Sequence, residues 1–226
     1  MKKILILLCA ILWGIGAEAQ RLRSADTTTD DLKQLLAEAG YQTHAFDLTD
    51  FLSKTYHVQL QIREYIAGEQ VKTLTWDFEN RMMVTDFSKE EQQEIKRLGI
   101  AYNFKKGILA QADRLVLQLI PTKCDSLRTL SMNLPNMGTS HARLQLRPIS
   151  DGKSSYYNYA MRPFQLKEFR EGEFTPLLFY GSYWFDARAN RFRFCGEKQI
   201  APDLSSEIVE RVPHFFVIGV QMTPME

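Results

Sequence analysis

The chain has 226 residues, of which 45% are hydrophobic and 24% are charged, a composition typical of globular proteins and unlike that of disordered or fibrous chains. Its 28 Lys and Arg residues nearly balance its 27 Asp and Glu residues, with the two signs intermixed along the sequence. This balance leaves no basic stripe for a phosphate backbone, so we expect no nucleic-acid partner.

The N-terminus has the order of features found in a cleavable secretory signal peptide. Two lysines open it, residues 4–15 are almost entirely apolar, and Ala17-Glu18-Ala19 supplies a small-x-small cleavage pattern. The apolar run is shorter than the about 20 residues that a spanning helix needs, which argues against an uncleaved anchor. We therefore expect a signal peptide over residues 1–19 and one exported domain over residues 20–226, without a transmembrane segment after cleavage.

Two helices are predicted in the first half of the chain, each with a capping box. The first covers residues 30–39, and Thr28 and Asp31 form its capping box. It has one apolar stripe that we expect to pack on another element. The second covers residues 89–98, is highly charged, and presents Ile95 and Leu98 inward.

Strands account for most of the remaining chain. Alternating apolar residues predict a hairpin from residues 56–66 and 70–78 that turns at Ala67-Gly68-Glu69. We expect a second hairpin around residues 186–190 and a closing strand, residues 214–222, whose apolar run indicates burial on both faces. Further strands are predicted at 115–120, 127–134, 141–149, 156–161, 177–185 and 191–195, with that at 156–161 paired to the one before it, and a short helix at 205–211.

Many short strands separated by Gly, Pro, Asp and Asn favour a mainly β fold, an antiparallel sandwich or barrel-like domain with a few short peripheral helices. An α+β arrangement is the alternative. The charged stretch at residues 88–97 is then the best place for a boundary.

Motifs that identify an enzyme or a metal site by spacing do not occur in this sequence. It has no Gly-rich phosphate loop, no nucleophile elbow, no two-histidine zinc helix and no calcium loop, and its four histidines are scattered. We therefore expect no metal and no cofactor, and binding is favoured over catalysis.

Aromatic residues are concentrated in the C-terminal half, and they include Tyr183 and Trp184, which we predict to bind a ligand. Exposed aromatic rings stack on sugar faces and are common at protein interfaces. The alternative is that these rings belong to the core. The remaining aromatic residues of the group are Tyr156, Tyr157, Tyr159, Phe164, Tyr180 and Phe185.

A glycan hydrolase would need two carboxyl groups that flank the bond to be cleaved. Candidates are Asp77, Glu79 and Asp86 near the end of one hairpin, and Asp186 with Glu197 near another. Asp186 also suits the start of a turn, since its side chain can accept hydrogen bonds from the following backbone.

Two cysteines, Cys124 and Cys195, remain after cleavage of the predicted signal peptide. An oxidising compartment would allow them to form one disulfide, the only possible connectivity for two cysteines. The alternative is two separate buried thiols.

Two short patterns carry a resemblance. The Ala-Glu-Ala-Gln ending of the signal region resembles that of exported Bacteroidetes proteins, and the layout of the chain is similar to that of uncharacterised exported domains in that phylum. Asp26-Thr27-Thr28 and Asp125-Ser126-Leu127 are similar to the O-glycosylation acceptor pattern of the same group, which implies modification at Thr27 and Ser126.

The sequence therefore favours an exported protein of the periplasm, the cell surface or the extracellular space. The expected role is a non-catalytic component of the cell envelope that binds a glycan or an envelope protein. The alternative function is a secreted glycan hydrolase that uses a carboxylate pair.

Overall fold

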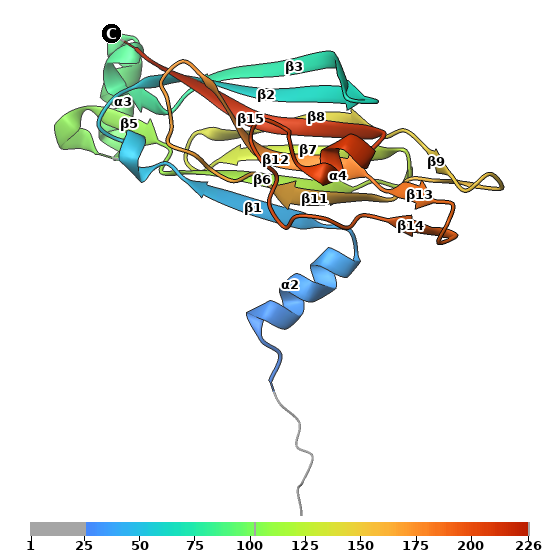
Figure 1. The fold of residues 1–226 in the computed structure, drawn as a ribbon. Helices are drawn as coiled ribbons and strands as arrows, with labels where there is room; N and C mark the ends of the chain where they lie inside the picture. Colours follow the sequence, from blue (N-terminus) through green and yellow to red (C-terminus); the bar gives the residue numbers. More distant parts are fainter. Residues whose placement is uncertain (1–25, 102, 226) are drawn as a thin grey trace, which may run out of the picture. The chain divides into compact units, whose positions relative to one another are not determined.

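A computed structural model describes residues 26–101 and 103–225 (Figure 1). The chain divides into two compact units, residues 1–35 and residues 36–226. The predicted signal peptide, residues 1–19, and the predicted start of the mature chain lie outside the described residues.

Helix α2, Thr29–Glu38, has the predicted capping box. The Thr28 backbone donates to Asp31 Oδ2 at 2.7 Å, and the Asp31 backbone donates back to Thr28 Oγ1 at 3.3 Å. Its apolar stripe is exposed, with Leu35 at 63%. Packing of this stripe on another element stays a prediction, because helical spacing specifies an apolar face and not what covers it.

The central layer is an antiparallel five-stranded sheet with the order β11-β12-β15-β2-β3 (Figure 1). The predicted hairpin is formed by β2, Tyr56–Ile66, and β3, Glu69–Glu79, and it turns through Ala67 and Gly68, both at positive φ. The predicted closing strand is β15, His214–Pro224, which lies between β12 and β2 and is buried on both faces. The sheet is completed by β11, Tyr159–Pro163, and β12, Phe174–Ser182.

A second antiparallel sheet has four strands in the order β1-β6-β7-β8. Its bounds are β1, Gln42–Asp47; β6, Arg114–Pro121; β7, Leu127–Leu134; and β8, Gly138–Gln145. The predicted strands at 115–120 and 127–134 are confirmed, whereas β1 was not expected from the sequence. Among the described residues the two sheets stay separate, so the fold is a sandwich and the barrel-like form is not adopted.

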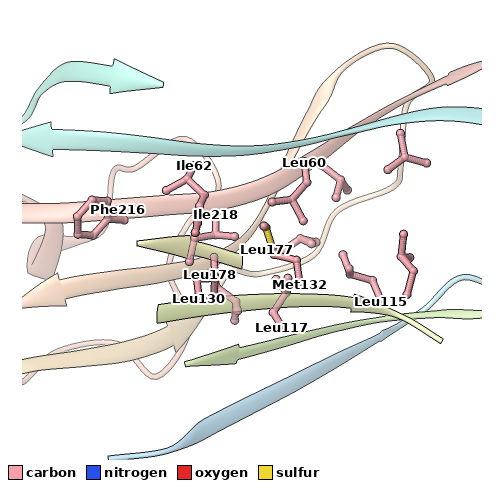
Figure 2. Close-up of a cluster of buried hydrophobic side chains, with 14 of the residues drawn as sticks. Leu60, Ile62, Leu115, Leu117, Leu130, Met132, Leu177, Leu178, Phe216 and Ile218 are labelled. Carbon is pink, nitrogen blue, oxygen red and sulfur yellow. The ribbon is translucent and has the colours of Figure 1, made fainter. Parts of the chain in front are cut away.

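The main core lies between these two sheets (Figure 2). Leu60, Ile62 and Ile218 from the five-stranded sheet meet Leu130 and Met132 from the four-stranded sheet, and all five are at most 5% exposed. Alternation along each strand sends these side chains to one face, so burial in the core sets which residues of each strand are apolar.

A smaller second core covers the opposite face of the five-stranded sheet. Phe215 and Val217 of β15 alternate with the main-core residues and pack with Ile208 and Val209 of helix α4, Glu207–Arg211. The strand β15 therefore contributes to two cores, which explains its nearly unbroken apolar sequence.

Short elements join the sheets. They are η1, Thr49–Phe51; β4, Arg81–Met83; η2, Val84–Asp86; α3, Lys89–Leu98; η3, Phe104–Lys106; β5, Ile108–Gln111; β9, Ile149–Ser150; β10, Ser155–Tyr156; β13, Trp184–Asp186; and β14, Arg191–Arg193. The predicted hairpin near residue 188 is confirmed as β13 and β14.

Two finer expectations about these elements are wrong. The segment predicted as one strand at 156–161 is divided, because β10 pairs with β9 while β11 pairs with β12. Helix α3 has its predicted Ser88 and Glu91 capping box, but only Ile95 is buried and Leu98 is 52% exposed.

Candidate functional site

A pocket lies at the edge of the sandwich where β11 and β12 of one sheet approach β1, β6 and β7 of the other. Its volume is about 440 Å³ and its wall is rich in tyrosine, so we call it the tyrosine pocket. It is lined by Ala37, Gly40, Gln42, Leu119, Arg128, Tyr157, Asn158, Tyr159, Tyr180 and Tyr183.

Three of the four tyrosines are held by other side or main chains. The ring of Tyr159 lies 5.3 Å from that of Tyr180, and Tyr180 is only 2% exposed. The ring of Tyr183 stacks on Phe194 with centroids 5.1 Å apart, and its backbone N–H donates to the carbonyl of Asn158 at 2.8 Å. These contacts fix the rings before any ligand arrives, which lowers the entropic cost of binding.

Arg128 brings a positive charge to this wall. Its Nη1 donates to the carbonyls of Leu127, at 2.7 Å, and Asp125, at 3.2 Å, so the plane of the guanidinium is set by the β6–β7 turn. Burial raises the pKa of Tyr180, and the neighbouring Arg128 acts in the opposite direction. Tyr180 is therefore a neutral phenol beside a fixed cation.

Tyr159 is anchored behind the pocket by a buried polar chain. Its hydroxyl is hydrogen-bonded to Nδ1 of His214, and it accepts from the backbone N–H of Arg147 at 2.9 Å. His214 Nε2 lies 3.1 Å from Glu64 Oε1, and the His214 side chain is 3% exposed. Since Glu64 accepts, Nε2 carries the imidazole proton and Nδ1 is an acceptor for the hydroxyl of Tyr159. The carbonyl of Arg147, 3.1 Å from the same hydroxyl, is its second acceptor.

The protonation states of this chain follow from its burial. Burial lowers the pKa of His214, an effect that Glu64 opposes and Arg147 adds to. Burial also raises the pKa of Tyr159 well above its usual range. Both groups are thus neutral near pH 7, and Tyr159 is a positioned ring rather than an activated nucleophile.

The two predicted ligand-binding residues have different environments. Tyr183 lines the tyrosine pocket, as described above. Trp184 is half-buried and packs against the second core, and it is not part of the pocket wall. Tyr183 lies between β12 and β13, and Trp184 is the first residue of β13.

Three of the candidate carboxylates gather at a different place, an apolar cleft of about 580 Å³ between β3 and β8. Asp77 and Glu79 lie two residues apart on the outer face of β3, and Asp77 accepts from Gln59 Nε2 at 3.1 Å. Asp86 Oδ2 accepts from the backbone of Met83 at 2.6 Å. All three stand on the rim of this cleft, and none lines the tyrosine pocket.

The second carboxylate pair, Asp186 and Glu197, accepts hydrogen bonds from nearby backbone N–H groups. Asp186 Oδ1 accepts from the N–H groups of Arg188, at 3.0 Å, and Ala189, at 3.1 Å, as expected of a residue that starts a turn. Glu197 Oε1 accepts from the first N–H of α4, that of Glu207, at 3.0 Å. These bonds hold both side chains in their loops.

Cys124 and Cys195 are free and exposed, so the predicted disulfide is not formed in this structure. Cys124 lies in the β6–β7 turn, whereas Cys195 follows β14, and spacing along the chain did not reveal that separation. The alternative of two buried thiols is wrong as well. A hydrogen bond with Ser126, whose Oγ lies 3.1 Å from Sγ, lowers the pKa of the Cys124 thiol.

The two predicted glycosylation residues, Thr27 and Ser126, differ in solvent exposure. Thr27 is exposed just before α2. Ser126 is half-buried in the β6–β7 turn, where its hydroxyl contacts Cys124. Modification of either residue stays a prediction.

Sequence reasoning identified the tyrosines but missed Arg128 and Asn158. By alternation, Arg128 lies with apolar residues on the inward face of β7 and is half-buried there. A charged residue at such a position is unusual, and this was the sequence signal that could have identified it. Its proximity to Tyr180 depends on the packing of the two sheets, which no local pattern specifies.

Within residues 26–101 and 103–225, no three His, Cys, Asp or Glu side chains are arranged so that they could hold a metal ion. In the same part of the chain, none of the helices has the length and apolar character needed to cross a membrane.

Comparison with known proteins gives a family but no activity. No curated protein and no solved structure matches the chain. A family model described as a domain of unknown function, DUF5041, matches residues 15–224. Because this match covers nearly the whole chain, including both sheets and both cleft regions, the protein belongs to the DUF5041 family.

Proposed function

We propose that this protein is an exported, non-catalytic component of the cell envelope that binds a glycan in the tyrosine pocket. The observation that carries the proposal is the convergence of four tyrosines, Arg128 and Asn158 on one wall, from segments that are far apart in the sequence. Aromatic faces can stack on the apolar face of a sugar ring, while amide and guanidinium groups donate to its hydroxyl or carboxyl oxygens.

The rigidity of the wall supports binding. Tyr159 is held by His214 and the backbone of Arg147, Tyr183 by Phe194, and the guanidinium of Arg128 by two carbonyls. A preformed wall retains more of its contact energy as affinity.

Export is part of the proposal and rests on the sequence of residues 1–19. Their charge, apolar run and Ala17-Glu18-Ala19 ending have the order of a signal peptide. An exported protein meets glycans of the envelope and the extracellular space.

The hydrolase alternative has less support. Hydrolysis needs two carboxyl groups on opposite sides of a bound sugar. Asp77 and Glu79 lie on the same face of one strand, and the carboxylates of Asp86, Asp186 and Glu197 accept hydrogen bonds from nearby backbone N–H groups.

A glycan array probed with residues 20–226 tests the proposal. We expect retention of a subset of glycans, and a loss of about fivefold in affinity on Tyr183→Ala, since an aromatic contact contributes on the order of 1 kcal/mol. Tyr156→Ala is the matched control, because Tyr156 is an exposed neighbour outside the pocket.

Two results would contradict the proposal. One is retention by the Tyr183→Ala variant at wild-type affinity. The other is an array with no retained glycan when the same protein still captures envelope proteins, which would assign the pocket to a protein partner.

A further inference from the structure

The cleft between β3 and β8 lies at the opposite edge of the sandwich from the tyrosine pocket. Both strands are the last of their sheets, β3 in the five-stranded sheet and β8 in the four-stranded sheet. The cleft has a volume of about 580 Å³ and is lined by Trp76, Asp77, Phe78, Glu79, Arg81, Met82, Asp86, Phe87, Leu115, Met132, Leu134, Met137, Gly138, Thr139 and Ser140.

The interior of the cleft is apolar and continuous with the main core. Trp76 and Phe78 point inward from β3 and are half-buried, and Met132 stands opposite them on β7. Met132 and Leu115 are drawn in Figure 2 at this part of the core. The flexible side chains of Met82, Met132 and Met137 can adapt to different apolar occupants.

The rim of the cleft is acidic. Asp77 and Glu79 are exposed on β3 and Asp86 is exposed in η2, while the single lining cation, Arg81, turns a guanidinium nitrogen, Nη2, to the carbonyl of Leu52. Asp77 Oδ1 also lies 3.0 Å from Nε2 of His57. The rim therefore presents three exposed carboxylates, one of them hydrogen-bonded to an imidazole, and attracts positive charge.

The free edge of β3 adds a second means of recognition. A strand at the end of a sheet presents unpaired backbone N–H and C=O groups along its outer side. From Thr73 to Glu79, the half of β3 that borders the cleft, the sequence contains no proline or lysine that would discourage pairing.

We propose that an extended segment of a partner protein pairs with the free edge of β3 and places alternate apolar side chains in the cleft. The alternation of β3 specifies the partner's pattern. Side chains in register with Trp76 and Phe78 enter the apolar cleft, and those in register with Asp77 and Glu79 face the acidic rim. The partner segment is therefore an alternating apolar and basic strand.

Charge disfavours a second copy of the same chain paired in parallel register. In that arrangement Asp77 and Glu79 of one molecule lie beside the same carboxylates of the other, and like charges on adjacent strands are destabilising. The proposal is independent of glycan binding, since the two sites share no residue.

A fluorescein-labelled peptide of alternating lysine and valine is the probe, and anisotropy measures its binding to residues 20–226. We expect binding that weakens as salt is added, and no binding of a peptide with glutamate in place of lysine. A peptide of the same composition arranged in two blocks should bind more weakly, because it cannot place apolar and basic side chains on opposite faces.

Charge variants connect the binding to the rim. The double variant Asp77→Asn, Glu79→Gln should weaken binding about fivefold at low salt, the range expected for two exposed ion pairs. The control is Asp50→Asn, Glu210→Gln, which removes the same charge from exposed residues outside β3 and the cleft and should leave affinity unchanged. Thermal unfolding checks that all variants are folded.

Tryptophan fluorescence locates the peptide. In a Trp184→Phe variant, Trp76 is the only tryptophan of residues 20–226, and its emission should shift to shorter wavelength on binding. The proposal is overturned if the peptide fails to bind at about 1 mM, if the block peptide binds equally well, or if the rim variant binds like the control. A Trp76 shift with an apolar dye and not with the peptide would assign the cleft to a small molecule instead.

Discussion

The hydroxyl of Tyr159 on β11 is hydrogen-bonded to Nδ1 of His214 on β15, across the intervening strand β12. Ser182, the residue of β12 in register with Tyr159, is small enough to allow this contact over its side chain. His214 then reaches Glu64 on β2. Side chains of β11, β15 and β2 are thus linked across four neighbouring strands. Residues in the middle of the sheet therefore hold Tyr159 in its place in the wall of the tyrosine pocket.

Acid should weaken the fold through His214. Its folded pKa is below the ordinary 6.5, so between these two values the unfolded chain binds more protons than the folded one. The free energy of unfolding then falls as pH decreases below 6.5 and levels off below the folded pKa. Urea denaturation at about pH 7.5 and about pH 5.5 measures this.

The variant His214→Asn should lose less stability over that interval than the wild type. His44, whose pKa is also lowered by burial, is present in both proteins, so the difference between them reports His214 alone. Equal losses in the two proteins would show that His214 does not titrate as its environment implies.

Removal of the Tyr159 hydroxyl should destabilise the fold. Tyr159→Phe leaves Nδ1 of His214 and the N–H of Arg147 without their partner, at a cost of about 1–3 kcal/mol in the free energy of unfolding. Tyr156→Phe is the control, with an expected change within about 0.5 kcal/mol, because that hydroxyl is exposed. A silent Tyr159→Phe variant would mean that water replaces the hydroxyl.

Asn80 should be among the polar residues most important for stability. It is fully buried, its Oδ1 accepts from the N–H of Tyr56 at 2.7 Å, and its Nδ2 donates to the carbonyl of Phe51 at 3.1 Å. Asn80→Ala should lower the free energy of unfolding by about 1–3 kcal/mol, because these buried groups lose their partner. In Asn133→Ala, where only a hydroxyl contact with Thr139 is lost, the change in urea midpoint should be smaller.

The exposed stripe of α2 leads to the opposite expectation from that of its sequence pattern. An apolar stripe packed on the core would make Leu35→Asp strongly destabilising. Because Leu35 is 63% exposed, we expect a change within about 0.5 kcal/mol. Leu178→Ala, at a fully buried position, should cost about 2–5 kcal/mol by the same measurement. A large loss on Leu35→Asp would reveal a partner for the stripe.

Export predicts a specific processed chain. The intact mass of protein recovered from its native host should correspond to a chain that begins at Gln20, since cleavage is expected after Ala19. A mass that still includes residues 1–19 would refute both processing and the envelope role built on it.

Local sequence patterns were sufficient for elements whose determinants lie within a few residues. The hairpin of β2 and β3, the capping box of Ser88 and Glu91, and the buried character of β15 all follow from alternation, capping and apolar runs. Each depends on contacts between near neighbours in the chain or on burial of a whole segment. The mainly β class follows from the number and spacing of such segments, whereas the choice of a sandwich over a barrel-like form does not.

Strand order and the sites were decided only in three dimensions. Alternation states which side of a strand is buried, but not which strand lies beside it, so the pairing of β11 with β12 and the separation of Cys124 from Cys195 were not predictable. The tyrosine pocket likewise joins Arg128 to Tyr180 across two sheets. Such contacts depend on how whole sheets pack, and the free energy of that packing is spread over the entire core rather than encoded beside either residue.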